Sequence, residues 1–118
     1  MRRLVEVRTY RLKPGIEAEF HDAIVNRGLP LVRTAGMDVV AFGFSAEDAN
    51  GYFLIRAFAS PEDRQATEDA FYSSEAWKKG PRQSIVEHIE SYHDTLIWLG
   101  SDAVELLRRD LSYAAKGN

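Results

Sequence analysis

Hydrophobic and polar residues alternate with a period of two in four stretches of the chain, which is the pattern of half-buried β-strands. The stretches are residues 4–12, 37–45, 52–58 and 92–99. Asn50-Gly51 lies between the second and third stretches and is a strong signal for a tight hairpin turn. The pattern therefore predicts four strands, of which the middle two form a hairpin.

Hydrophobic residues recur at helical spacing in the segments between the strands. The first helix begins near Pro14, and Pro30 is expected to kink or end it. A second helix begins at Ser60-Pro61, where a capping serine precedes a proline in the first turn, and it breaks near Ser73-Ser74. It restarts after Gly80-Pro81 and is expected to include Ile85 and Ile89.

A last amphipathic helix follows Gly100, so the order is β-α-β-β-α-β plus a C-terminal helix. This order predicts an α+β, ferredoxin-like fold with a four-stranded antiparallel sheet. We expect residues 1–100 to form that domain, and residues 101–118 to form the C-terminal helix with a short ragged tail at 116–118.

The two helices of this topology cover one face of the sheet and leave the other face for something else to cover. We expect Val5, Val7, Phe53 and Ile55 to face the helices. The open face then carries Glu6, Arg8, Tyr10, Tyr52, Leu54, Arg56 and Phe58. This set is too apolar to be left in water, and its charges need partners when buried. A homodimer with packed sheets would satisfy both needs by pairing Glu6 with Arg8 or Arg56. The C-terminal helix then either clasps the partner or covers the sheet edge.

Composition excludes several classes of protein. The chain has 118 residues, a 45% hydrophobic fraction and a net charge of −3, which suit one globular domain and argue against a nucleic-acid partner. Cysteine is absent, so there is no thiolate nucleophile or cysteine-ligated zinc, and the three histidines match no metal-site spacing. We expect no metal or other cofactor, because no phosphate-binding or hydrolase motif is present. With no membrane span or secretory signal in the sequence, a cytoplasmic location is expected.

EVRTY at residues 6–10, followed by LKPG at 12–15, resembles the opening of the NIPSNAP family, and residues 71–82 resemble a segment of its bacterial members. With Ser91-Tyr92-His93-Asp94, the resemblance spans residues 4–99. It implies a dimeric α/β barrel, in which two open sheet faces enclose a cavity. Relatives of that architecture include cofactor-independent monooxygenases, haem-degrading enzymes and muconolactone-isomerase-like proteins.

Glu6, Arg8 and Tyr10 share one face of the first strand and are expected to project into the same cavity, together with Arg56. Their functional interpretation is a polar cluster that orients a ligand, with an arginine binding a carboxylate or enolate. Their structural interpretation is a buried ion-pair network that fixes the register of the dimer. The two interpretations are compatible.

Trp77, Arg82 and His93 complete the candidate ligand-binding set. Trp77 lies in a helix break and is either a wall of the pocket or an anchor for an irregular segment. Arg82 lies in a first helical turn, where a cation opposes the helix dipole, which suggests a specific carboxylate partner. His93 is the one histidine expected near the cavity, as a base or a haem ligand, and Asp94 then points away from it.

The leading hypothesis is a homodimer that binds a small aromatic or acidic molecule between sheet and helices, as a cofactor-independent monooxygenase or isomerase. The alternative is a non-catalytic interaction module whose cavity is filled by side chains and whose C-terminal helix is the functional surface. Burial of Leu107 and Leu111 against the protein's own sheet would argue against that alternative.

Overall fold

The structure, a computed structural model, describes residues 1–115, with side chains described as far as Ser112. The tail expected at residues 116–118 lies outside the described residues. The strands are β1 (Arg2–Leu12), β2 (Asp38–Phe44), β3 (Gly51–Phe58) and β4 (Ile89–Gly100). The helices are α1 (Glu17–Ala23), the π-helical turn η1 (Ile24–Gly28), α2 (Leu29–Thr34), α3 (Pro61–Tyr72), α4 (Glu75–Lys78), α5 (Arg82–Val86) and α6 (Ser101–Ala115).

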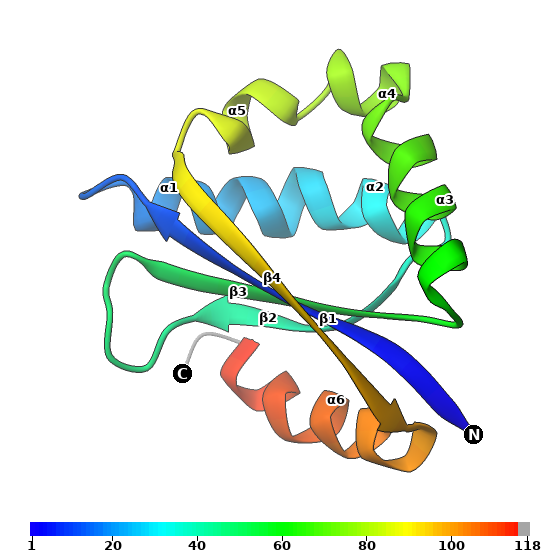
Figure 1. The fold of residues 1–118 in the computed structure, drawn as a ribbon. Coiled ribbons are helices and arrows are strands. Elements are labelled where there is room, and N and C mark those ends of the chain that lie inside the picture. Colours follow the sequence, from blue (N-terminus) through cyan, green and yellow to red (C-terminus); the bar gives the residue numbers. More distant parts are fainter. Residues whose placement is uncertain (116–118) are drawn as a thin grey trace.

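The four strands form one antiparallel sheet in the order β2-β3-β1-β4, which confirms the ferredoxin-like topology. Strand β1 lies between β3 and β4, and β4 is an edge of the sheet (Figure 1). The register places Glu6 directly opposite Arg56 on β3, and Arg8 opposite Asp94 on β4. Oppositely charged residues in such cross-strand positions stabilise the pairing of the strands.

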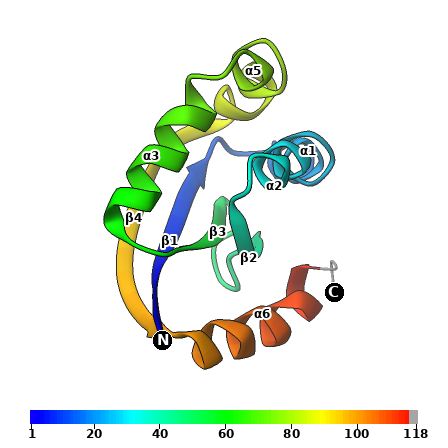
Figure 2. The same ribbon diagram turned by 90° about the vertical axis from the view of Figure 1, so that its right-hand side faces the viewer.

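The sheet separates two hydrophobic cores. Helices α1 to α5 lie on one face and α6 lies on the other (Figures 1 and 2). The larger core lies under α1 to α5 and includes Tyr10, Phe20, Leu54 and Trp77. The smaller core contains Val5, Val40, Ala41, Ile55, Ala57 and Val104, the last of which comes from α6. Each face of the sheet is therefore covered at least in part by the chain's own helices.

The expected assignment of the two sheet faces is wrong. Tyr10, Tyr52, Leu54 and Phe58 pack in the core under α1 to α5, whereas Val5, Ile55 and their neighbours Val7 and Phe53 pack with α6. Glu6, Arg8 and Arg56 are buried, and Arg64 of α3 pairs with Glu6. Period-two alternation separates the faces correctly but does not state which face the helices cover. The sequence pattern does not reveal the partners of the buried charges, because the charged residues of α3 that pair with them are distant in sequence.

The first helical segment is irregular before Pro30 but does not end there. The backbone widens into η1, which ends at Gly28, and continues as α2 from Leu29. A π-helical turn relieves the lost hydrogen bond and the steric clash that a proline brings to a regular helix. Ile89, expected in a helix, is the first residue of β4.

Helix α6 lies across the second face of the sheet, mainly over β2. Val104 is fully buried there, and Leu107 and Leu111 pack partly buried against the same core. Arg108 fastens the helix to β2 by hydrogen bonds to Asp38 (3.0 Å) and to the carbonyl oxygen of Val39 (2.9 Å). The apolar side of α6 thus packs against the chain's own sheet. This argues against the alternative hypothesis that α6 is a surface for binding another protein.

Candidate functional site

A cavity of about 420 Å³ lies between the sheet and helices α3, α4 and α5. This volume is within the range of small-molecule sites. We call it the α3–α5 cavity; its lining is Arg8, Tyr10, Glu68, Asp69, Tyr72, Trp77, Arg82, Ile85, Val86, Ile89 and Tyr92. Four of the seven candidate residues from the sequence, Arg8, Tyr10, Trp77 and Arg82, therefore line one cavity.

Capping serines at the N-termini of α3 and α4 help to position the aromatic wall of the cavity. Ser60 caps α3 by accepting a hydrogen bond from the Asp63 backbone (3.0 Å), and Ser74 caps α4 by accepting one from the Trp77 backbone (3.2 Å). The break between α3 and α4 turns Trp77 back against Tyr72, with their ring centroids 5.4 Å apart and nearly perpendicular. Trp77 is only 7% exposed, so it both anchors this irregular segment and forms a wall of the cavity.

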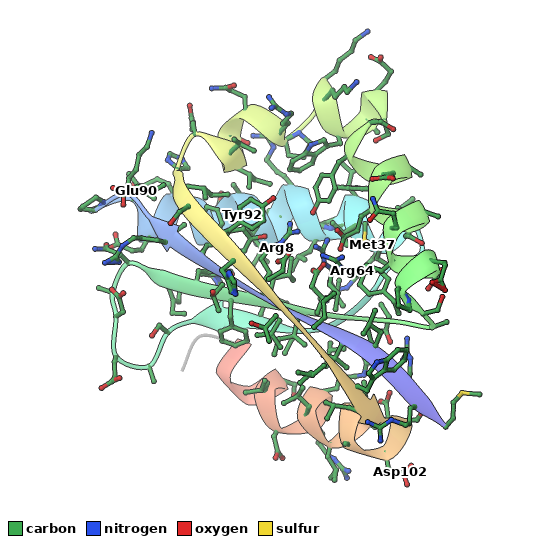
Figure 3. The ribbon with its side chains drawn as sticks, viewed as in Figure 1. Arg8, Met37, Arg64, Glu90, Tyr92 and Asp102 are labelled. Carbon is green, nitrogen blue, oxygen red and sulfur yellow. The ribbon has the colours of Figure 1, made fainter. Side chains whose placement is uncertain are left out.

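Six charged side chains meet beside the cavity. This charge cluster consists of Glu6, Arg8, Arg56, Arg64, Glu68 and Asp94. These side chains come from β1, β3, β4 and α3. Figure 3 shows Arg8 and Arg64 between β4 and α3. Three guanidinium groups thus face three carboxyl groups, so the cluster is neutral when every group is ionised.

Glu6 and Arg56 form the buried base of the cluster. Both side chains have no exposure, and Arg56 donates two hydrogen bonds to one Glu6 oxygen, at 2.6 and 2.9 Å. Arg64 donates to the other oxygen at 2.8 Å. Burial raises the pKa of Glu6, but hydrogen bonding to Glu68 and the Arg56 and Arg8 charges outweigh it and hold that pKa at about 2. Glu6 is therefore a permanent carboxylate.

Glu68 differs from Glu6 although the two carboxyl groups are hydrogen-bonded partners. Its arginine contacts are longer: 3.2 Å to Arg56, 3.6 Å to Arg64 and 3.8 Å to Arg8. Burial, followed by the hydrogen bond to Glu6, raises the pKa of Glu68 to about 7. Two carboxyl groups that share a site divide in this way, with one ionised and the other retaining a proton.

Arg8 is held on all sides by the protein. It donates to both oxygens of Asp94, at 2.7 and 3.0 Å, and its guanidinium lies 4.5 Å from the ring centroid of Tyr92. Its remaining nitrogen donates to the Tyr72 hydroxyl at 3.3 Å. Burial lowers the pKa of Arg8, but the hydrogen bond to Asp94 together with the interactions with Tyr72, Tyr10 and Glu6 outweighs it, so that this pKa is raised. Each of its three nitrogens donates one hydrogen bond to the protein, so Arg8 orients and polarises its neighbours.

The Tyr72 hydroxyl accepts two hydrogen bonds from cations, one from Arg8 (3.3 Å) and one from Arg56 (3.0 Å). Its own proton has no acceptor among the residues that the structure describes, and Tyr72 is one of the residues that line the α3–α5 cavity. Tyr10 lies deeper, and burial raises the pKa of its hydroxyl to about 12. The Tyr10 hydroxyl is therefore neutral near neutral pH.

Arg82 is an exposed cation at the rim of the same cavity. Within the described part of the chain it makes no ion pair or side-chain hydrogen bond. The carboxylate partner that its unfavourable helical position suggested is therefore not among the described residues.

The structure gathers six of the seven candidate residues in or beside one cavity. Glu6 and Arg56 lie beneath the lining, and Arg8, Tyr10, Trp77 and Arg82 form part of it. His93 is separated from them, because it lies opposite Thr9 on the other face of the sheet. The strand alternation instead directs Asp94 to Arg8, so the choice of His93 over Asp94 is wrong.

Sequence reasoning missed Arg64, Glu68 and Tyr72. They lie at successive intervals of four residues and so share one face of α3. That spacing was available from the sequence, as a polar stripe ending in an aromatic residue. A stripe of charges on a helix is normally a solvated face, so the spacing alone does not mark these residues as part of a site.

Among the described residues, no group of histidine, aspartate or glutamate side chains is arranged to hold a metal ion. None of the described helices combines the length and apolar character needed to cross a bilayer.

A family model described as NIPSNAP matches residues 5–100. A NIPSNAP family protein of unknown function from Agrobacterium tumefaciens has a similar structure, with a TM-score of 0.77, 23% identity, and coverage of 83% of this chain and 88% of that one. A NIPSNAP domain protein from Burkholderia xenovorans has a TM-score of 0.74 at 20% identity, with coverage of 83% and 95%. A Bordetella bronchiseptica protein provisionally described as an antibiotic biosynthesis monooxygenase has a TM-score of 0.64 at 20% identity, with coverage of 86% and 98%. No curated protein matches the sequence.

Proposed function

The chain belongs to the NIPSNAP family, and from this we propose that it is a homodimer that binds a small aromatic or acidic molecule in the α3–α5 cavity. We further propose that it acts on this molecule without a cofactor, in a reaction of the monooxygenase or isomerase type. One observation supports the proposal above the others: Arg82, an exposed cation with no partner among the described residues, stands at the rim of a cavity walled by Tyr72 and Trp77.

The lining matches an aromatic acid. Tyr10, Tyr72, Trp77 and Tyr92 offer flat apolar surfaces, against which a conjugated ring can pack. Arg82 offers a planar guanidinium to a carboxylate, in the geometry that such pairs prefer. With Glu68 protonated, the charge cluster behind them has three guanidinium groups and two carboxylates, so its positive charge also favours an anion.

The homodimer is proposed to form along β4. This edge strand exposes Tyr92 (58%), Leu96 (44%) and Trp98 (46%) on the face that α1 to α5 cover, and Ile97 (39%) on the face that α6 covers. A long edge strand with exposed apolar side chains is usually covered by another chain. Ile89 and Tyr92 also line the α3–α5 cavity, so a partner along β4 would add a further wall to it.

Calorimetric titration with trans-cinnamate, a planar aromatic acid, tests the binding. Cinnamyl alcohol has the same ring and no carboxylate, and it should bind at least about 10-fold more weakly, because a charged hydrogen bond is lost. Arg82→Ala should weaken cinnamate binding to the same extent. Lys78→Ala is the matched control, because it removes a nearby exposed cation that does not line the cavity.

Native mass spectrometry of the freshly purified protein tests the assembly in parallel. A dimer that carries a reproducible additional mass would support an occupied cavity and would identify the class of ligand. Failure of aromatic acids to bind, together with a dimer without any additional mass, would contradict the small-molecule function and favour a side-chain-filled interface.

A further inference from the structure

Glu68 is the only carboxyl group that is both a member of the charge cluster and part of the lining of the α3–α5 cavity, within the chain that the structure describes. Its side chain is 12% exposed, whereas that of Glu6 is not exposed at all. Asp69 also lines the cavity but is exposed and is held by Gln65 at 3.0 Å. Glu68 is therefore partly desolvated and still within reach of a bound molecule.

The surroundings of Glu68 support a reversible change of protonation. On its own helix it faces Arg64 and Tyr72, on β1 it faces Glu6 and Arg8, and Arg56 approaches from β3. Asp94 on β4 completes the shell by holding Arg8 and Arg64. Glu6 accepts a hydrogen bond from protonated Glu68, and the three guanidinium groups stabilise the two carboxylates when that proton leaves. A carboxyl group that can exchange its proton near neutral pH is suited to general acid and base catalysis.

Tyr72 lies one helical turn after Glu68, on the same face of α3. Its hydroxyl oxygen accepts from Arg8 and Arg56, which polarises the O–H bond and leaves the proton for another acceptor. A donor of this kind stabilises negative charge that develops on a substrate oxygen. A base and an oxyanion donor thus border the same cavity, on one helix.

We propose that Glu68 is a catalytic residue that moves a proton on a carbonyl-containing aromatic acid, so that the reaction is an isomerisation. This inference rests on the proposed function, since it requires the acid to bind with its carboxylate at Arg82. A Glu68 carboxylate oxygen takes a proton from the carbon next to the carbonyl group. The C–H electron pair becomes the new C=C bond, and the carbonyl oxygen becomes an enolate that accepts the Tyr72 proton in a hydrogen bond. Glu68 then returns its proton to the enolate oxygen or to another carbon of the conjugated system. No oxidant or reductant is consumed.

Phenylpyruvate is a suitable probe, because it is an aromatic acid with an exchangeable C–H next to a ketone. The rate at which its methylene hydrogens exchange in D₂O is measured by proton NMR, with and without the intact protein. We expect the protein to accelerate exchange, and Glu68→Gln to lower the protein-dependent rate by about 100-fold or more. Glu62→Gln is the matched control, because it removes an exposed carboxylate from the same helix and should leave the rate unchanged.

Two further readouts separate catalysis from a structural role. The protein-dependent rate should rise with pH through about 7, following ionisation of Glu68, and Glu68→Gln should abolish that dependence. Tyr72→Phe should lower the rate and leave the pH midpoint near its original value. Glu68→Gln should still bind phenylpyruvate in calorimetry, which shows that the variant is folded.

Each outcome decides the proposal. Binding of phenylpyruvate without accelerated exchange would overturn the catalytic inference and leave the proposed binding function standing. Exchange that survives Glu68→Gln would overturn the assignment of Glu68. Failure of both phenylpyruvate and cinnamate to bind would overturn the proposed function, and the inference with it.

Discussion

Arg56 donates two hydrogen bonds to Glu6 across adjacent strands, and neither side chain has any exposure to solvent. The pair occupies directly opposed positions of β1 and β3. The pair lies between the sheet and α3, where Arg56 also donates hydrogen bonds to Tyr72 and Glu68. The cavity lining is therefore built on an ion pair that the ligand does not need to touch.

Removing one partner of this pair should be strongly destabilising. Arg56→Met leaves the Glu6 carboxylate buried with one cation fewer, and we expect the free energy of unfolding to fall by about 3–5 kcal/mol. The double variant Glu6→Leu/Arg56→Met leaves neither charge and should recover a large part of that loss. Urea unfolding of the two single variants and the double variant measures the coupling, and strictly additive losses would contradict it.

The stability of the protein should depend on pH in two opposite ways. The pKa of Glu68 is raised from 4.5 to about 7, so between these values the folded state binds more protons than the unfolded state. The free energy of unfolding therefore falls as pH rises through this range, by about 3 kcal/mol. Glu6, with its pKa lowered to about 2, acts in the other direction, and its contribution is lost as pH falls from about 4.5 to about 2.

Glu68→Gln removes the first of these effects. Urea midpoints at about pH 5 and about pH 8 should then differ much less than in the unchanged protein. An equal fall in stability in both proteins would show that the decline comes from another group.

A charge placed on the exposed side of β4 should prevent dimer formation. Leu96 is 44% exposed on this edge strand, so Leu96→Lys should cost the monomer little and should disfavour a buried interface. Light scattering coupled to size exclusion should give a dimer for the unchanged protein and a monomer for this variant. Leu106→Lys, at a 53% exposed position of α6, is the control and should remain dimeric.

Gly80 is required where the chain passes from α4 to α5. A Cβ at this position would press against the backbone carbonyl oxygen of Ala76, and a backbone atom cannot move aside cheaply. Gly80→Ala should lower the free energy of unfolding by about 1–3 kcal/mol. It should also weaken cinnamate binding, because this junction positions Trp77 and Arg82. Gly100→Ala meets no atom within 4 Å and should change stability by less than about 0.5 kcal/mol.

The sequence alone determined the order of the elements and the grouping of side chains along each strand. Period-two alternation placed Glu6, Arg8 and Tyr10 on one face, and they do share one face. Hairpin and capping signals located the turn before Gly51 and the start of α3 at Ser60. These features depend on neighbours close in sequence, so local pattern is sufficient to predict them.

Only the tertiary structure decided which face the helices cover and which groups complete the site. Alternation is symmetric with respect to the two faces, so it could not choose between them. Glu6 and Arg64 are separated by 58 positions, and Arg8 and Asp94 by 86. A buried charge is tolerated only with its partner in place. Sequence alone therefore does not predict that Glu6 and Arg8 lie in a core, because it does not show these partners. Burial of Glu68 beside Glu6 likewise exists only when α3 is folded onto β1, and this burial is what raises its pKa.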